Sequence, residues 1–457
     1  MTERTSMHGQ WSSRLAFILA ATGSAVGLGN IWKFPYITGE YGGGAFVLVY
    51  LACVVAIGLP VMIAEVLIGR RGRQSPINTM RCLAKEAGRS RVWSLLGWTG
   101  VLAGFLILSY YSVIAGWAMA YVFKAGSGVL QGLDGAAVGS VFSALVSDPV
   151  QLVFWHSLFM LMTGLVIARG VQSGLERAVR VLMPALFALL LVLLGYALTS
   201  GGVARGFDFL FSPDLSKLST GAILTAMGHA FFTLSLGMGA IMMYGSYLPQ
   251  DASIAKTSLV IAGLDTLVAL LAGMVIFPIV FANGLEPGAG PGLIFQTLPI
   301  AFGQMPWGGF FGTLFFLLLV FAAWSSAISL IEPAVAWLVE NHDMGRARAT
   351  LLVALSTWFL GLASVLSFSD WAFDFSFLGA QKENGIFDIL DLLTSNFMLP
   401  LGGLAMALFA TWVMRRADVV EELAMGDGAG FRGWYYLARY VTPVGLVFIF
   451  LNGLGLL

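Results

Sequence analysis

The sequence predicts an all-α membrane protein with eleven transmembrane helices. Hydrophobic residues make up 58% of the 457 residues and charged residues only 11%, a balance too apolar for a water-soluble domain. A segment of about 20 apolar residues crosses a bilayer. The predicted spans are residues 11–34, 44–69, 94–123, 150–168, 175–199, 221–247, 254–283, 309–340, 347–367, 386–414 and 434–456.

The basic residues predict the orientation of these spans. If the N-terminus lies inside the cell, all of the 24 Lys and Arg residues fall on the cytoplasmic side except Lys33, Lys124, Arg205, Lys217 and Lys382. Cytoplasmic loops of membrane proteins are enriched in Lys and Arg, so we expect residues 1–10 in the cytoplasm. The odd number of spans then places the C-terminus outside. The net charge of zero argues against a nucleic-acid partner.

The first span contains a predicted break at mid-membrane. Its sequence from Ala21 to Tyr36 is A-T-G-S-A-V-G-L-G-N-I-W-K-F-P-Y, with the break placed on Gly23, Gly27 and Gly29. Irregular backbone at this depth is tolerated only where protein buries it or where it lines a cavity. Freed amides attract anions and unwound carbonyls attract cations. This pattern indicates a site for a small charged molecule together with a cation.

The sixth span repeats this pattern. Residues 230–240 read A-F-F-T-L-S-L-G-M-G-A, so that Gly237 and Gly239 correspond to the glycines of the first break. Spans 1 and 6 cross the membrane in opposite directions, which predicts two inverted five-helix repeats with the site between them. The predicted parts are the N-terminal segment 1–10, the repeats 11–199 and 200–414, and an extra helix with the C-terminus at 415–457.

Polar side chains inside the spans are the candidate ligands. Asp265 lies well within the seventh span, where an ionised carboxylate is costly unless it is paired. No basic residue occurs in a span at a comparable depth, so its partner is a cation or a proton. Asn30 fits a cation ligand or a helix cap. Thr233 fits a ligand or a hydroxyl that bonds to its own helix.

A second group of polar residues is open to two interpretations. Ser325, Ser326 and Ser329 of the eighth span fit either helix packing or binding of an ion and a substrate. Tyr111 lies near the middle of the third span, although membrane tyrosines usually lie at the interfaces. Its phenol is a candidate donor to a carboxylate. Buried Glu65 and Glu332 are expected to form structural hydrogen bonds.

Residues near the outer surface predict a gate. Lys33 with Asp388 and Asp391 fits an outer ion pair or charges that only reach the interface. The long loop 284–309, rich in Gly and Pro, fits a lid over a cavity or a packed surface loop. His229, one turn before Thr233, fits a proton carrier or a neutral hydrogen-bonded imidazole.

At these residues the chain resembles the neurotransmitter:sodium symporter family, the group of the bacterial leucine transporter. The matching motifs are W-x-x-R-L-x-F-I-L-A at Trp11, G-S-A-V-G-L-G-N-I-W-K-F-P-Y at Gly23, G-G-G-A-F at Gly42, R-G-x-x-x-G-x-E-R at Arg169, F-F-T-L-S-L-G-M-G at Phe231 and R-Y-x-T-P at Arg439. The resemblance extends over nearly the whole chain. It implies the leucine-transporter fold, and the eleven spans resemble a bacterial subgroup of hydrophobic amino-acid carriers in the cytoplasmic membrane.

The resemblance also implies specific ligands. The first sodium ion would be bound by the Ala25 carbonyl, Asn30, Thr233 and Asp265, together with the substrate carboxylate. The second would be bound by the carbonyls of Gly23, Val26 and Ala322 with the hydroxyls of Ser325 and Ser326. An amino acid would bind through its carboxylate to Leu28, Gly29 and Tyr111, through its ammonium to Ala25, Phe232, Thr233 and Ser235, and through its side chain to Ile107, Phe232, Met238, Ser326, Ser329 and Leu330.

Several residues depart from the family pattern. Ala269 stands where bacterial members carry a carboxylate in place of bound chloride, and Asp265 stands where many members have Asn. We therefore expect Asp265 to supply the missing charge and transport to be independent of chloride. Lys33 replaces the usual outer-gate Arg. His229 replaces the usual Gln. The usual N-terminal Arg aligns near His8, which leaves Trp11 with Glu340 and Tyr247 as the expected inner gate.

These observations predict a sodium-coupled symporter, not an enzyme, that imports a neutral hydrophobic or aromatic L-amino acid by alternating access. The expected partners are the amino-acid substrate, two sodium ions and the lipid bilayer. A proton-coupled transporter or exchanger using His229 and Asp265 is an alternative. An intramembrane enzyme would need an activated nucleophile, but Ser325 and Ser326 have no deep His or Lys partner. A passive channel is the remaining alternative.

Overall fold

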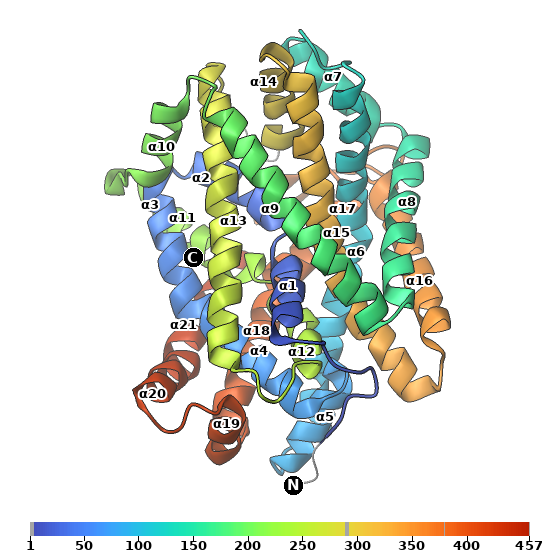
Figure 1. Cartoon of the computed structure of the whole chain (residues 1–457), viewed down its shortest axis with the longest axis vertical. Coiled ribbons are helices and arrows are strands. Elements are labelled where there is room, and N and C mark those ends of the chain that lie inside the picture. The colour runs from blue at the N-terminus through green and yellow to red at the C-terminus, as the bar shows by residue number, and fades with distance from the viewer. Residues whose placement is uncertain (1–3, 288–291, 379, 457) are drawn as a thin grey trace.

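The computed structural model describes residues 4–287, 292–378 and 380–456, and these form a bundle of long helices (Figure 1). The two longest helices, α6 (Ser94–Gly126) and α15 (Gly308–His342), pack against each other. Between them and the surrounding helices lies α1 (Arg14–Ala25), which contacts α9, α13 and α15. A broken helix is thus held at the centre of the bundle.

The described residues contain nine helices that are long and apolar enough to cross a membrane, or ten if one bent pair is counted as a span. The nine are Gly44–Gly72, Arg91–Gly126, Pro149–Ala168, Val171–Ala197, Ile254–Ala282, Gly308–His342, Arg346–Leu366, Gly385–Val413 and Ala429–Gly453. The bent pair is Arg14–Ala25 with Gly29–Glu40, at 50°. The predicted class, an all-helical membrane protein, is confirmed.

Several spans are continuous helices with a π-helical turn. They comprise α3, η2 and α4 (Gly44–Cys53, Val54–Gly58, Leu59–Gly72), η4 and α9 (Val171–Glu176, Arg177–Ala197), α17, η7, α18 and η8 (Gly385–Leu392, Leu393–Met398, Leu399–Leu408, Phe409–Val413), and α20, η9 and α21 (Ala429–Tyr436, Leu437–Val441, Thr442–Gly453). Helices α8 (Pro149–Ala168), α13 (Ile254–Ala282) and α16 (Arg346–Leu366) run without one. Side chains of Ser13, Asp148 and Ser253 accept hydrogen bonds at the starts of α1, α8 and α13, which satisfies free amides there.

The sixth predicted span, 221–247, is divided. Helix α11 (Thr220–Thr233) and helix α12 (Ala240–Ser246) are separated by residues 234–239, and neither is long enough to count as a span alone. Ser235, Gly237 and Gly239 have positive φ angles of 55°, 83° and 74°, so this segment cannot continue the helix. The predicted break in segment 6 is present. The eleven-span count and the inverted repeat stay predictions.

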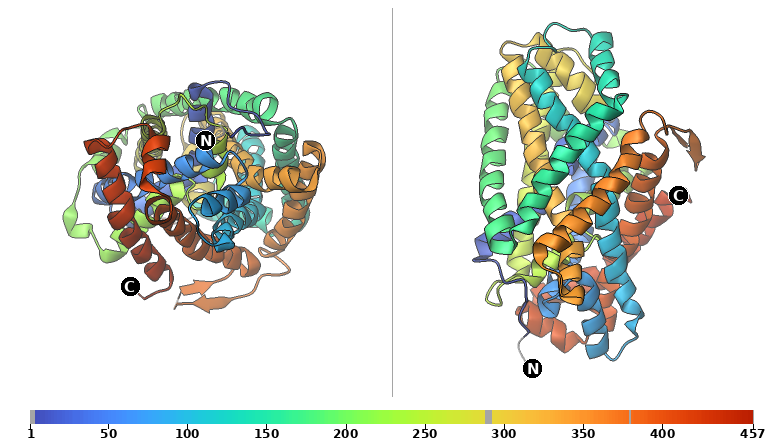
Figure 2. Two further views of the ribbon diagram at one scale, coloured as in Figure 1. Left: turned by 90° about the horizontal axis from the view of Figure 1, so that it is seen from below. Right: turned by 90° about the vertical axis from the view of Figure 1, so that its right-hand side faces the viewer.

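The loops contain structure that the sequence patterns did not predict. Helices α5 (Pro76–Glu86), α7 (Gly135–Val146), α10 (Val203–Phe211) and α19 (Arg416–Leu423) lie between spans, with short 3₁₀ turns η3 (Arg91–Trp93) and η5 (Leu215–Lys217). Strands β1 (Phe375–Phe377) and β2 (Ala380–Lys382) form an antiparallel hairpin that projects from the bundle (Figure 2). These elements are too short for a clear periodic signal.

The predicted lid loop is partly helical. It contains η6 (Leu293–Thr297) and α14 (Leu298–Gln304), while residues 288–291 lie outside the described ranges. Phe295 packs edge-on against Trp32, whose ring lies 6.0 Å away, and against Trp117 at 5.7 Å. The described part of the loop therefore contacts the first and third predicted spans.

Candidate functional site

The first span breaks at residues 26–28. Helix α1 ends at Ala25, Val26 is extended with ψ 104°, and the π-helical segment η1 (Gly29–Lys33) continues into α2 (Phe34–Glu40). The prediction that Gly23 lies at the break is wrong, because Gly23 is within α1. A Cβ on Gly27 would lie 2.4 Å from Ser326 Oγ and 2.9 Å from Tyr111 Oη. Gly27 therefore lets the broken backbone reach both hydroxyls.

Asn30, Thr233 and Asp265 come together beside the break. Asn30 Nδ2 donates to Asp265 Oδ1 at 2.8 Å and to the Asp265 carbonyl at 3.0 Å, and Thr233 Oγ1 lies 3.2 Å from Asp265 Oδ2. All three side chains are buried. The groups come from η1, α11 and α13, so the two broken spans and the seventh predicted span meet at one carboxylate.

Asn30 also caps the second half of the broken span. Its Oδ1 accepts a hydrogen bond from the Gly27 amide at 3.1 Å. Amides at a helix start carry partial positive charge and need acceptors. Asn30 can therefore act both as a helix cap and as a cation ligand. Its oxygen accepts from the free Gly27 amide at the break, and its side chain lies beside the Asp265 carboxylate.

A second group of oxygens surrounds Ser326 of α15. Its Oγ lies 3.0 Å from the Ser24 carbonyl, 3.3 Å from that of Val26 and 3.4 Å from that of Gly23. The preceding residue, Ser325, donates through its Oγ to the Ala322 carbonyl at 3.1 Å. The five residues predicted for a second sodium ion are thus neighbours. The Ser24 carbonyl was not predicted.

A small cavity of about 30 Å³ lies between these two groups. It has room for only about one or two water molecules. Its lining contains every residue predicted to bind substrate except Ser329, namely Ala25, Leu28, Gly29, Ile107, Tyr111, Phe232, Thr233, Ser235, Met238, Ser326 and Leu330. Ser329 Oγ lies just behind it and bonds to Ser24 Oγ and the Ser326 carbonyl, each at 2.7 Å.

A larger cavity of about 470 Å³ adjoins the small one on the side of Lys33 and Asp391. The two cavities share Leu28, Gly29, Ile107, Tyr111 and Phe232, so the small cavity is reached from this side. Gly292, Phe295 and Gln296 of the predicted lid also line the larger cavity.

The predicted outer-gate residues lie in this larger cavity but do not form an ion pair within the described ranges. Lys33 Nζ lies 4.6 Å above the Phe232 ring, a cation–π contact. Asp391 Oδ1 accepts from Ser395 Oγ at 2.9 Å and lies 3.4 Å from Tyr110 Oη. Asp388 accepts from the Asn384 amide at 2.9 Å. The path to the site is open on this side.

The opposite side is closed by aromatic packing. Trp11 is buried, its Nε1 donates to the Tyr244 carbonyl at 3.0 Å, and its ring lies 5.8 Å from that of Tyr247. Tyr247 donates to Glu332 at 2.6 Å, and Glu332 pairs with Arg346. The predicted contact between Trp11 and Tyr247 is present.

Glu340 was predicted to form the inner gate with Trp11 and Tyr247, but its hydrogen-bond partners are other residues. Its carboxylate pairs with His8 Nε2 at 3.0 Å and accepts from the Ser75 amide at 2.7 Å and Asn78 Nδ2 at 2.8 Å. Trp11 and Glu340 are therefore linked through the N-terminal segment, not by direct contact. The positions of Trp11 and His8 in the sequence did not indicate that His8 would pair with Glu340.

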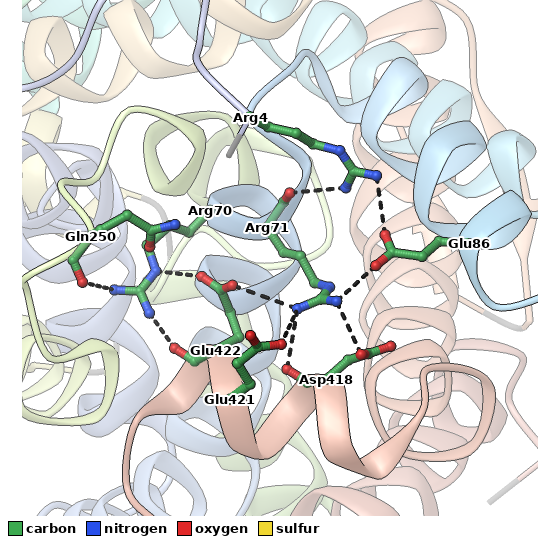
Figure 3. A network of polar contacts seen from close by, with 8 residues as sticks. All are labelled: Arg4, Arg70, Arg71, Glu86, Gln250, Asp418, Glu421 and Glu422. Atoms are coloured by element: carbon green, nitrogen blue, oxygen red, sulfur yellow. Dashed lines mark hydrogen bonds and ion pairs between the residues drawn. The ribbon is translucent and has the colours of Figure 1, made fainter. Parts of the chain in front are cut away.

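A network of ion pairs is centred on the buried side chains of Arg70 and Arg71 (Figure 3). Arg70 at the end of α4 pairs with Glu422 of α19 at 2.6 Å, and Arg71 pairs with Asp418 at 3.1 Å and with Glu86 of α5 at 2.7 Å. Arg4 of the N-terminal segment also reaches Glu86, at 3.1 Å. The network links the C-terminal ends of α4 and α5 to each other and to α19.

Removal of one partner from this network is expected to destabilise the fold. In the Glu422→Ala variant, Arg70 stays buried without its carboxylate, which costs about 3 kcal/mol or more. The matched control is Asp427→Ala, because the Asp427–Arg416 pair is exposed and contributes less than about 1 kcal/mol. Denaturation in detergent measures both. Equal losses in the two variants would contradict the prediction.

Acid is expected to weaken the contact at Glu86. Burial raises the pKa of the Glu86 carboxyl, but Arg71 and Arg4 lower it more, so the pKa lies below the ordinary value of 4.5. A lowered folded-state pKa stabilises above the unfolded value, and this stabilisation is lost as the pH falls through the folded pKa. The stability difference between wild type and Glu86→Gln should therefore shrink below pH 4.5. A constant difference in denaturation scans would exclude this contribution.

Two further buried groups support the broken spans. Glu65 Oε1 accepts from the Gly237 amide at 2.6 Å, which fixes the unwound segment between α11 and α12. His229 packs against Tyr50 and Phe34 at 5.4 Å and 5.9 Å between ring centroids. Neither His229 nitrogen has a hydrogen-bond partner in the described part of the chain.

The donor set is suited to an alkali cation. Within the described residues no three His, Cys, Asp or Glu side chains form a group that would hold a metal ion. What the site offers is hydroxyl, amide and unwound carbonyl oxygens with one carboxylate. Such oxygens at broken membrane helices coordinate sodium.

Comparison with known proteins identifies the class. The model of the sodium:neurotransmitter symporter family matches residues 8–131 and 143–455. A sodium-dependent transporter of Bacillus subtilis is 40% identical over 98% of each chain, and one of Haemophilus influenzae is 33% identical over 99% of this chain and 100% of its own length. A solved structure of MhsT in complex with L-phenylalanine is similar with a TM-score of 0.88 and 43% identity, covering 97% of this chain and 99% of that one.

The broken central helix, its oxygen clusters and the multi-span bundle thus define a membrane transporter. The chain belongs to the sodium:neurotransmitter symporter family. It is a sodium-dependent symporter and not an enzyme, as the sequence predicted.

Proposed function

We propose that this symporter imports a neutral L-amino acid with a hydrophobic or aromatic side chain, coupled to two sodium ions and without chloride. The observation that carries the proposal is the meeting of Asn30, Thr233 and Asp265 at the break of the first span. An unpaired carboxylate buried at this depth needs a cation. The cation itself is transported cargo.

The first sodium ion is assigned to the Ala25 carbonyl, Asn30, Thr233 and Asp265. The second is assigned to the carbonyls of Gly23, Val26 and Ala322 and the hydroxyls of Ser325 and Ser326. The close approach of Ser326 to the end of α1 supports the second assignment, because a cation there would neutralise several carbonyl dipoles at a helix C-terminus.

The substrate is assigned to the small cavity between the two ion sites, which has to widen toward the adjoining cavity of about 470 Å³ to admit an amino acid. Its carboxylate would bind the Leu28 and Gly29 amides and Tyr111, whose hydroxyl already accepts from the Leu28 amide at 3.2 Å. Its ammonium would bind carbonyls at Ala25, Phe232, Thr233 and Ser235. Its side chain would lie among Ile107, Phe232, Met238, Ser326, Ser329 and Leu330. No charged residue is among them and four of the six are apolar, which favours an apolar side chain. The complex of MhsT with L-phenylalanine supports the same substrate class.

Chloride independence rests on Asp265 and Ala269. Ala269, one turn after Asp265 on α13, is buried and has no polar side-chain atom to bind an anion. The negative charge that balances two sodium ions is therefore provided by Asp265 and the substrate carboxylate.

The transport cycle starts from the conformation seen here, with the cavity at Lys33 and Asp391 open and the side at Trp11 closed. The open side faces the exterior if the N-terminus is cytoplasmic. Substrate binding then brings Lys33 and Asp391 together under the lid loop, and separation of Trp11 from Tyr247 releases the cargo. Entry of two net charges contributes about 4.6 kcal/mol at 100 mV.

Uptake into liposomes tests the proposal. Purified protein is expected to concentrate one or more of Leu, Met, Phe, Tyr and Trp only under an inward sodium gradient, and to do so equally in chloride and in gluconate. Uptake that stops in gluconate and returns with chloride would refute chloride independence. Flux that neither saturates nor depends on sodium would refute the symport mechanism.

Coupling to protons is a second candidate, favoured by the unpartnered imidazole of His229. In that case a pH gradient alone would drive uptake, and His229→Gln would abolish this component while sodium-driven uptake persists.

A further inference from the structure

A cleft of about 430 Å³ lies on the flank of the bundle, apart from the two transport cavities. Its walls come from the end of α8, the π-helical segment η4, the start of α9 and the middle of α15. The lining residues are Val166, Arg169, Ser173, Gly174, Arg177, Ala178, Val181, Leu182 and Trp324. Two of them are arginines and none is acidic.

The guanidinium groups of Arg169 and Arg177 have no hydrogen-bond or ion-pair partner among the residues that the structure describes, and both residues are exposed. Arg180, one turn further along α9, differs: it pairs with Glu176 at 2.6 Å and donates to Ser12 Oγ at 2.7 Å. Two neighbouring positive charges without a carboxylate attract an anion, and guanidinium groups bind phosphate through paired donors.

The remainder of the cleft is apolar. Val181 is 65% exposed, and Leu182 and Trp324 line the wall beside it. Trp324 Nε1 is buried and has no hydrogen-bond partner in the described ranges. The cleft therefore combines a charged end with an apolar wall.

The position of the arginines matches the membrane surface. Arg169 follows the span Pro149–Ala168, and Arg177 lies in the first turns of the span Val171–Ala197. Glu176 accepts from the Ser12 amide at 3.0 Å, so this end of the cleft lies beside the N-terminal segment. Val181 and Leu182 are about one turn further along α9, at 1.5 Å per residue, toward the hydrocarbon.

We propose that this cleft binds the headgroup of an anionic phospholipid. Its phosphate lies between Arg169 and Arg177, and an acyl chain lies along Val181 and Trp324. The apolar wall distinguishes a lipid from a soluble phosphate. The nearby Glu176 is paired with Arg180 and no acidic residue lines the cleft, so the two arginines distinguish an anionic from a zwitterionic headgroup. The proposal does not depend on the identity of the transported substrate.

Native mass spectrometry of the purified full-length protein in neutral detergent tests the site. The probes are phosphatidylglycerol, phosphatidylcholine and glycerol 3-phosphate. Arg169→Ala/Arg177→Ala is compared with Arg89→Ala/Arg91→Ala, which removes two exposed arginines that lack ion pairs in the described part of the chain. We expect wild type and the control to retain phosphatidylglycerol, and the cleft variant to bind it about thirtyfold more weakly, roughly fivefold for each arginine.

Two further variants make the test specific. Arg169→Lys/Arg177→Lys keeps the charge but loses the planar donor pair, so intermediate binding is expected even if the alanine variant does not fold. Val181→Ser makes the exposed part of the apolar wall polar and should weaken binding a fewfold. Equal phosphatidylglycerol binding by wild type and cleft variants would overturn the proposal, as would an equal loss in the control. Phosphatidylcholine or glycerol 3-phosphate binding as tightly as phosphatidylglycerol would also overturn it.

Discussion

Replacement of Asp265 by alanine is expected to raise the sodium concentration needed for substrate binding by at least about tenfold, equivalent to about 1.4 kcal/mol. The Asp265 carboxylate is fully buried and lies within reach of Asn30 and Thr233. Without it, the protein itself would offer a sodium ion only neutral oxygens. Equilibrium binding of a radiolabelled substrate over a range of sodium concentrations measures the effect. Unchanged sodium dependence would contradict the assignment of this site.

A second variant separates the effect of the Asp265 charge from the effect of its shape on sodium binding. Asp265→Asn keeps the shape of the side chain and one accepting oxygen but removes the charge, so it should show most of the loss. Leu267→Ala, on the lipid-facing side of the same helix, should show none, since Leu267 is 45% exposed.

A second carboxylate tests why the charge is needed. In Asp265→Asn/Ala269→Glu the negative charge returns one helical turn away, at a position that is also buried. If Asp265 acts through its charge, this double variant should recover a large part of the sodium affinity without chloride. If Asp265 acts only as an oxygen ligand, the double variant should behave like Asp265→Asn.

The polar residues inside the spans could be predicted from the sequence because the membrane makes them conspicuous. Asn30, Thr233 and Asp265 stand out at mid-span, and the structure brings them to one place. The Ser24 carbonyl near Ser326 could not be predicted in this way. A backbone carbonyl is present at every residue, and only the path of the broken helix decides which one is free.

Whether each gate is open or closed could not be predicted from the sequence either. Lys33 and Asp391 are compatible with a closed or an open gate, and which one is populated depends on small energy differences between conformations of the whole bundle. The pairing of His8 with Glu340 joins residues 332 positions apart. Sequence spacing carries no signal for such a contact, whereas the glycine breaks at 27 and 237 are local and were visible.

Substitution of Gly27 by alanine is expected to abolish substrate binding while leaving the fold intact. The added Cβ would lie 2.4 Å from Ser326 Oγ and 2.9 Å from Tyr111 Oη, both lining the small cavity. Contacts under 3 Å force the hydroxyls apart, and a misplacement of about 1 Å can cost on the order of a hundredfold in a positioned site. The variant should therefore show at least about a hundredfold weaker binding.

The chain offers a matched control for this substitution. Gly263 lies within α13, and a Cβ there meets no atom within 4 Å. Gly263→Ala should thus leave binding unchanged and slightly stabilise the helix, by about 0.5–1 kcal/mol. Thermal unfolding in detergent separates a local from a global effect. If Gly27→Ala unfolds no earlier than wild type yet binds substrate normally, the break of the first span does not form the binding site.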